Sequence, residues 1–71
     1  MNAVELSRNE FAGLLARFED RAPVKEDFGT FVVHDGSIWI GVDNRFGHCL
    51  MMRFKSEADA RAFAEGRRGG E

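Results

Sequence analysis

The chain has 71 residues, a net charge of −2, one cysteine and 44% hydrophobic residues. This composition predicts one globular domain over residues 1–66 and a flexible tail over residues 67–71. It excludes an internal disulfide, the strongly basic surface of many nucleic-acid binders and the roughly 20-residue apolar run of a membrane helix. The polar N-terminus does not resemble a signal peptide, so we expect a cytoplasmic protein with no membrane partner.

The first predicted element is a helix from Arg8 to Arg21. Ser7 and Glu10 have the spacing of a capping box, in which each side chain accepts a hydrogen bond from the other residue's backbone. One apolar stripe follows helical periodicity through Phe11, Leu14, Leu15 and Phe18. Pro23 should end the helix, because the residue before a proline avoids helical dihedral angles. Residues 1–6 form either an extended arm or a short extra strand.

Two strands are predicted at residues 30–34 and 37–42, which are rich in β-branched and aromatic side chains. Asp35-Gly36 lies between them and is typical of a type I′ hairpin turn. This turn places Val33 opposite Ile38 and Val32 opposite Trp39.

Residues 48–54 are predicted to form a third antiparallel strand after a turn at residues 43–47. If Val42 pairs with His48, Leu50 lies opposite Ile40 and Met51 lies opposite Trp39. The last element is a short helix that begins after Ser56 and stops at Gly66. The predicted fold is therefore α+β, in the order α-β-β-β-α.

Side chains alternate between the two faces of a strand, so this register assigns each residue to a face. The first face holds the core residues Phe31, Val33, Ile38, Ile40, Val42, Leu50, Met52 and Phe54. The second face carries an apolar row formed by Val32, Trp39 and Met51, with His34, Cys49 and Arg53 beside it. We expect the first helix to cover the first face. The apolar row is then covered by one of the two helices, by a second copy of the chain or by another protein.

Groups suited to catalysis or metal binding are few. His34, His48 and Cys49 are the only histidines and cysteine, and the adjacent His48 and Cys49 point to opposite faces of a strand. A catalytic Cys-His pair needs both side chains within hydrogen-bonding reach. We therefore expect no enzyme activity, no metal site and no cofactor.

One segment resembles an RNA recognition motif. "GHCLMMRF" followed by "KSEADARAFAEG" is similar to the third strand and second helix of that family, which implies nucleic-acid binding on the sheet. The chain departs from the family where bases would stack, because Cys49 and Met51 occupy those positions. The Asp35-Gly36 hairpin also breaks the family's element order. An accessory nucleic-acid-binding domain is therefore the alternative function.

The whole chain is similar in type to small inhibitor proteins of phages and mobile elements, including anti-CRISPR proteins. The features shared with them are a short acidic chain, a helix on a small sheet and an apolar patch without a catalytic group. This resemblance implies a non-enzymatic module that inhibits or regulates a larger nucleic-acid-processing complex. We expect it to bind a protein partner, or a second copy, through Val32, Trp39 and Met51 together with His34, Cys49 and Arg53. Direct contact with nucleic acid is not expected.

Overall fold

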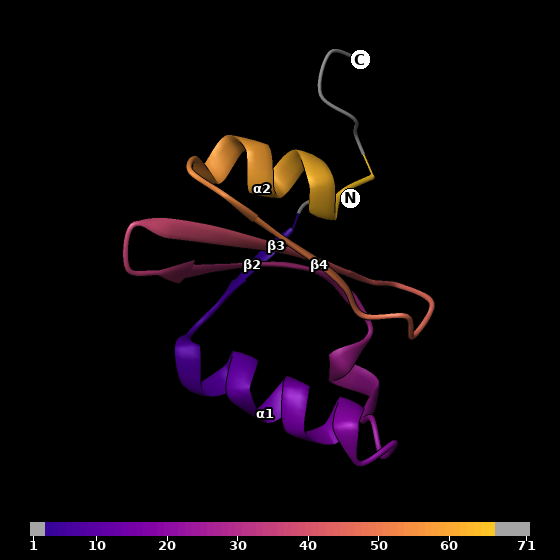
Figure 1. Ribbon diagram of the computed structural model, residues 1–71. Coiled ribbons are helices and arrows are strands. Elements are labelled where there is room, and N and C mark those ends of the chain that lie inside the picture. Colours follow the sequence, from indigo (N-terminus) through magenta and orange to yellow (C-terminus); the bar gives the residue numbers. More distant parts are fainter. Residues whose placement is uncertain (1–2, 67–71) are drawn as a thin grey trace.

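The computed structural model describes residues 3–66, so the predicted flexible tail at 67–71 lies outside the described residues. The chain is an α+β fold, as predicted, with two α-helices and a four-stranded mixed sheet (Figure 1). The elements are β1 (Val4–Leu6), α1 (Arg8–Glu19), the 3₁₀ helix η1 (Lys25–Asp27), β2 (Gly29–Asp35), β3 (Ile38–Asn44), β4 (Leu50–Phe54) and α2 (Glu57–Ala64).

The sheet has the strand order β1-β2-β3-β4. The predicted antiparallel meander is present as β2, β3 and β4, but the sheet also contains β1, which pairs parallel to β2. Val4 lies opposite Phe31 and Leu6 opposite Val33. The strand alternative for residues 1–6 is therefore confirmed for Val4–Leu6.

Helix α1 begins as predicted. The Ser7 hydroxyl accepts a hydrogen bond from the Glu10 amide at 3.1 Å, and Glu10 accepts one from the Ser7 amide at 2.8 Å. The helix ends at Glu19, earlier than predicted, because Arg21 adopts a left-handed φ of 56°. The Ala22 amide then donates to the Arg17 carbonyl at 2.9 Å, which closes the helix before Pro23 is reached.

The hairpin between β2 and β3 is present, but its turn lies one residue further along than predicted. Asp35 pairs with Ile38, so Gly36 and Ser37 form the turn, and Val33 lies opposite Ile40 instead of Ile38. Gly36 has a φ of 67° and Ser37 does not have a positive φ, a pattern typical of a type II′ turn. The pairing shifts by two residues, so the predicted faces of β2 and β3 are unchanged.

The predicted register of the third strand is wrong, and the error changes its faces. Val42 lies opposite Met51 instead of His48, and Trp39 lies opposite Phe54 instead of Met51. The reason is the loop: Cys49 has a left-handed φ of 51°, and its amide donates to the Asn44 side chain at 2.8 Å. The shift is an odd number of residues, so every side chain of β4 lies on the opposite face from the one predicted.

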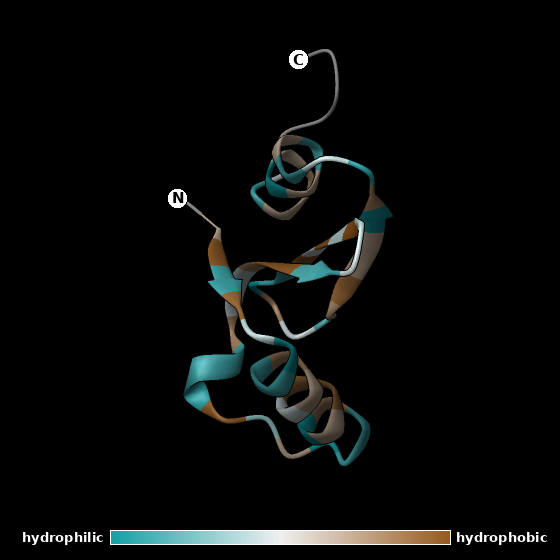
Figure 2. Cartoon of the chain, turned by 90° about the vertical axis from the view of Figure 1, so that its left-hand side faces the viewer, coloured by the Kyte–Doolittle hydropathy of each residue, from teal (hydrophilic) through white to brown (hydrophobic). Residues whose placement is uncertain are grey.

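The helices lie on opposite sides of the sheet, giving three layers (Figures 1 and 2). We call the two sides of the sheet the α1 face and the α2 face. The core of the α1 face comprises Leu14, Phe31, Val33, Ile40, Val42 and Cys49. The core of the α2 face comprises Ala3, Val32, Ala60 and Ala64, with Trp39 and Phe54 packed against it.

Helix α2 approaches the sheet closely because the contact residues are small. A Cβ atom placed on Gly41 would lie 2.5 Å from the Ala60 carbonyl oxygen, a distance that no side chain tolerates. Ala60 and Ala64 are fully buried. The α2 cap also forms as predicted, with the Asp59 amide donating to the Ser56 hydroxyl at 3.2 Å. Of the three coverings considered for the second face, a helix of the chain is the one observed.

Candidate protein-interaction surfaces

The six residues predicted as one binding surface lie in three separate places. Val32 is completely buried beneath α2, and Trp39 is half-buried against the same cluster. His34 stacks on Trp39, with ring centroids 4.3 Å apart and ring planes within 6° of parallel. The predicted open row of Val32, Trp39 and Met51 is therefore wrong, because α2 covers its first two members.

Met51, Arg53 and Cys49 lie away from Trp39. Met51 and Arg53 belong to the α1 face, since they pair with Val42 and Ile40. Cys49 is only 6% exposed and packs in the core of the α1 face. The three-residue shift in the register of β4 accounts for Met51 and Arg53, and the left-handed conformation of Cys49 in the preceding loop accompanies its place in the core.

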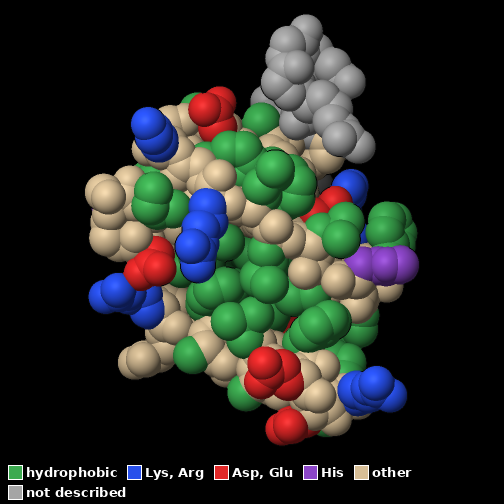
Figure 3. Space-filling model, in the orientation of Figure 1, with side chains coloured by type: hydrophobic (Ala, Val, Ile, Leu, Met, Phe, Trp, Pro, Cys, Tyr) green, Lys and Arg blue, Asp and Glu red, His purple; other side chains and the backbone are tan. Residues whose placement is uncertain are grey.

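The first exposed apolar surface is the edge strand β4. Leu50, Met51 and Met52, which we call the edge patch, are 54%, 45% and 55% exposed. Beside them a groove of about 420 Å³ lies between α1 and the sheet, and Phe11, Leu15 and Ile40 form its wall. Figure 3 shows hydrophobic side chains gathered across this side of the molecule, between the two helices.

The groove is open because the two helices cover different amounts of the sheet. Helix α2 contacts β2, β3 and β4, whereas α1 contacts mainly β1 and β2. The α1 face of β4 is therefore less covered by a helix than its α2 face. The amphipathic stripe of α1 indicates which side of the helix is buried, but it does not indicate how far across the sheet the helix reaches.

The second exposed apolar surface is a pocket of about 230 Å³, which we call the loop-end pocket. The pocket lies where the end of α1, η1 and the β3–β4 loop meet, and Leu14, Phe18, Pro23, Phe28, Asn44 and Gly47 are among its lining residues. Phe18 and Phe28 are 43% and 45% exposed, and Phe46 in the adjoining loop is 79% exposed. Large aromatic side chains around a small concave site are typical of protein contacts.

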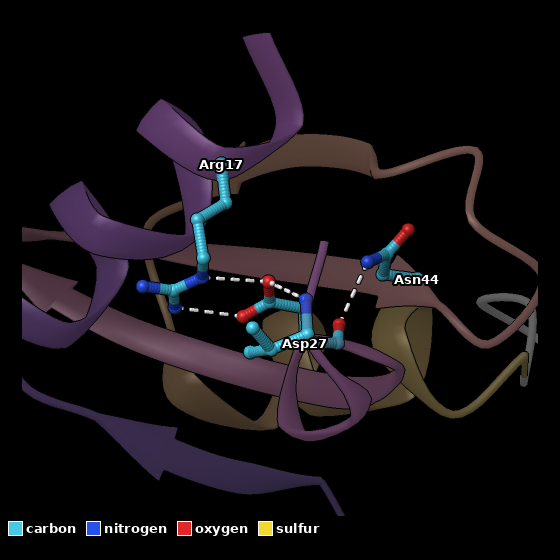
Figure 4. A network of polar contacts seen from close by, with 4 residues as sticks. Arg17, Asp27 and Asn44 are labelled. Atoms are coloured by element: carbon cyan, nitrogen blue, oxygen red, sulfur yellow. Dashed lines mark hydrogen bonds and ion pairs between the residues drawn. The ribbon is translucent and has the colours of Figure 1, made fainter. Parts of the chain in front are cut away.

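A network of polar side chains holds the loop-end pocket in place (Figure 4). The Arg17 guanidinium donates two hydrogen bonds of 2.7 Å to the carboxylate of buried Asp27, which also accepts from the Val24 amide at 3.0 Å. The Asn44 amide group donates to the Asp27 carbonyl at 2.7 Å and accepts from Cys49. These bonds join α1, η1, β3 and the β3–β4 loop, so the pocket walls are fixed relative to each other.

The charges of this network are balanced. Arg17 lowers the pKa of Asp27 below its usual value, mainly through the paired hydrogen bonds, and the Val24 amide acts in the same direction. Burial raises the pKa of the Cys49 thiol, and the nearby Asp27 charge adds to this effect. A thiol with a raised pKa is a poor nucleophile, which favours a structural role for Cys49.

No group of three or more histidine, cysteine or acidic residues is placed to hold a metal ion within residues 3–66. Over the same residues, no helix has the length and apolar character needed to span a membrane. His34 lies in β2 and His48 lies in the β3–β4 loop, and both are exposed.

The loop-end pocket could not be predicted from the sequence. Phe28 lies between the predicted first helix and the predicted first strand, and nothing in its local pattern indicates that it meets Phe18 at a pocket. Phe46 lies in the predicted turn at residues 43–47 and is exposed in the loop that adjoins the pocket. The signal in the sequence that could have indicated this pocket is the number of large apolar side chains that lie in turns or near Gly and Pro. In comparisons with known proteins, the chain matches no family model, no curated protein and no solved structure.

Proposed function

We propose that this chain is a small, non-enzymatic protein-binding module that inhibits or regulates a larger nucleic-acid-processing complex, as phage anti-CRISPR proteins do. The observation that carries the proposal is the loop-end pocket, where Phe18 and Phe28 are exposed in the lining of a concave site and Phe46 is exposed in the adjoining loop. Protein-binding energy is commonly concentrated in a few aromatic residues at such sites.

The rigidity of the pocket supports the same proposal. The Arg17–Asp27 pair and the Asn44 bonds fix the pocket walls before any partner arrives. A preorganised surface loses less conformational entropy on binding, so more of the contact energy contributes to affinity. The overall charge of −2 also does not favour binding to nucleic acid.

The test is inhibition of CRISPR immunity by the chain and by a pocket variant. The chain is expressed in bacteria that carry active CRISPR systems of several types, and phage plating is counted. We expect the wild type to restore plating against at least one type. Phe28→Glu should abolish the effect, because a charge at the pocket rim prevents apolar contact. Val4→Glu, 58% exposed on the β1 edge, is the matched control and should behave as the wild type.

Direct binding then identifies the target. Purified chain is titrated onto the purified effector complex of the affected type, and Phe28→Ala should weaken binding by roughly 30-fold, the effect of a hot spot of about 2 kcal/mol. Failure to restore plating against any type contradicts the inhibitor proposal. Binding to single-stranded RNA or duplex DNA alone, measured by fluorescence anisotropy, would replace it with the nucleic-acid alternative.

A further inference from the structure

The two edges of the sheet are protected to different degrees. An edge strand exposes unpaired backbone N–H and C=O groups, which can pair with a strand from another chain. At the β1 edge, the Ala3 amide donates to Glu65 at 2.8 Å and the Ala3 carbonyl accepts from Arg61 at 2.6 Å. Side chains of α2 therefore occupy backbone groups next to β1, which is itself only three residues long.

The β4 edge has no such protection from residues 3–66. In this part of the chain, β4 is five residues long, pairs with β3 on one side only and has no strand on its other side. Leu50 and Met52 lie on the α2 face and Met51 on the α1 face, so the edge is apolar above and below the sheet. Arg53 is the only charged residue in the strand, although edge strands commonly carry charges or proline that discourage pairing.

We infer that two copies of this chain pair antiparallel through β4 and form one continuous sheet of eight strands. A two-fold axis normal to the sheet at Met52 places each Met52 opposite the partner's Met52. Leu50 then lies opposite the partner's Phe54, and Met51 lies opposite the partner's Arg53. Paired residues lie on the same face in this register, and no two like charges are directly opposite.

A second copy fits this edge better than a peptide bound in the groove. A peptide in the groove contacts Met51 and Met52, which line it, and leaves Leu50 exposed. A second copy carries apolar side chains on both faces of its own β4, and the two grooves beside Phe11 and Leu15 meet across the axis. The net charge of −2 is too small to oppose association strongly.

The size of the molecule is compatible with such an interface. A stable interface takes about 800 Å² from each partner, which is roughly a sixth of the 5008 Å² surface of the chain. The edge patch and the groove lie on one side of the molecule, as Figure 3 shows. The loop-end pocket is built from other residues, so the dimer goes beyond the proposed function and does not depend on it.

The first test is molar mass by light scattering, from about 1 µM to about 1 mM, a range that covers micromolar dimers. We expect the wild type to reach about 16 kDa, twice the 8.0 kDa of one chain. Met52→Lys should stay monomeric and folded, because Met52 is 55% exposed. Val4→Lys, the control on the β1 edge, should dimerise as the wild type does. A monomeric wild type at every concentration, or equal masses for the two variants, overturns the inference.

The second test fixes the register by disulfide cross-linking. Directly opposite residues have Cα atoms about 4.5–5.5 Å apart, within the range of a disulfide, so oxidised Met52→Cys should give a covalent dimer. Leu50→Cys should not, because the two copies of residue 50 are offset by four residues, about 13 Å along the strands. The buried Cys49 is present in both variants and serves as a common background. Cross-linking of Leu50→Cys in preference to Met52→Cys overturns the register.

Discussion

The two faces of the sheet are covered by helices of opposite character. Helix α1 carries large apolar residues, yet it leaves the α1 face of β4 open. Helix α2 carries mainly alanines, yet it contacts β2, β3 and β4 and buries Val32 completely. The area of a sheet that a helix covers therefore depends on how closely the helix approaches the sheet as well as on the size of the helix's side chains.

The close approach of α2 can be broken at one residue. Gly41→Val should destabilise the fold by about 3 kcal/mol or more, since overpacking in a core costs 1–3 kcal/mol and here the clash is with backbone. Denaturant unfolding measures the change. Ala12→Val, at an exposed position of α1, is the control and should cost only several tenths of a kcal/mol through the lower helix propensity of valine. Equal stability of Gly41→Val and the wild type would show that α2 does not lie against β3.

The looser α1 layer depends on the Arg17–Asp27 pair. Asp27→Ala should cost about 2–3 kcal/mol, because it removes charge-assisted hydrogen bonds from a buried site. The variant should also open the loop-end pocket, so the ring signals of Phe18 and Phe28 should shift in an NMR spectrum while those of Phe63 on α2 do not. If the ring signals of Phe63 shift as much as those of Phe18 and Phe28, the network supports the α2 layer as well as the α1 layer.

The same pair predicts how stability depends on pH. The pKa of folded Asp27 is lowered, so its contribution is complete above about pH 4, the usual value for an unfolded aspartate. It is lost as the pH falls through the folded pKa. Asp27→Asn should therefore be less stable than the wild type at neutral pH and should lose less stability below pH 4. Some acid dependence should remain, because Arg45 lowers the pKa of Asp43. If the free energy of unfolding changed with pH in the same way for Asp27→Asn and the wild type, the role of Asp27 would be contradicted.

The smallest expected effect is at the end of α1. Arg21 has a left-handed φ of 56°, which costs a residue with a side chain roughly 1 kcal/mol relative to glycine. Arg21→Gly should raise the stability by about 0.5–1 kcal/mol, measured as an increase in the denaturant midpoint. Gly66→Arg, at the matching position after α2 with a φ of 81°, should lower it. A loss of stability in Arg21→Gly would show that the Arg21 side chain makes a contribution larger than the strain.

The parts of the fold that follow from local chemistry could be predicted from the sequence. The caps at Ser7 and Ser56 need only neighbouring residues, and both helices begin where they indicate. Gly36 fixes the presence of a hairpin but not which of two adjacent pairs forms the turn. Strand β1 could not be predicted with certainty, because its three residues are stable only beside β2, more than twenty residues away.

The candidate site was harder to predict than the fold. The faces of β4 depend on the conformation of Cys49, which is held by a hydrogen bond that the Cys49 amide donates to the side chain of Asn44. The small side chains of α2 do not by themselves indicate that it covers Trp39, but Gly41 within a strand is a known sign of close backbone approach. That glycine, read together with the alanines of α2, would have placed the last helix over the second face.

Whether β4 is an open edge that pairs with a second copy is tested by residue-resolved amide hydrogen exchange, measured at low and at high protein concentration. We expect amides of β2 and β3 beneath α2 to exchange slowly at both concentrations. Amides of β4 that point away from β3 should exchange fast at low concentration and more slowly at high concentration, as two copies pair. Fast exchange of these β4 amides at both concentrations, or slow exchange at both, would contradict an open edge that accepts a second copy.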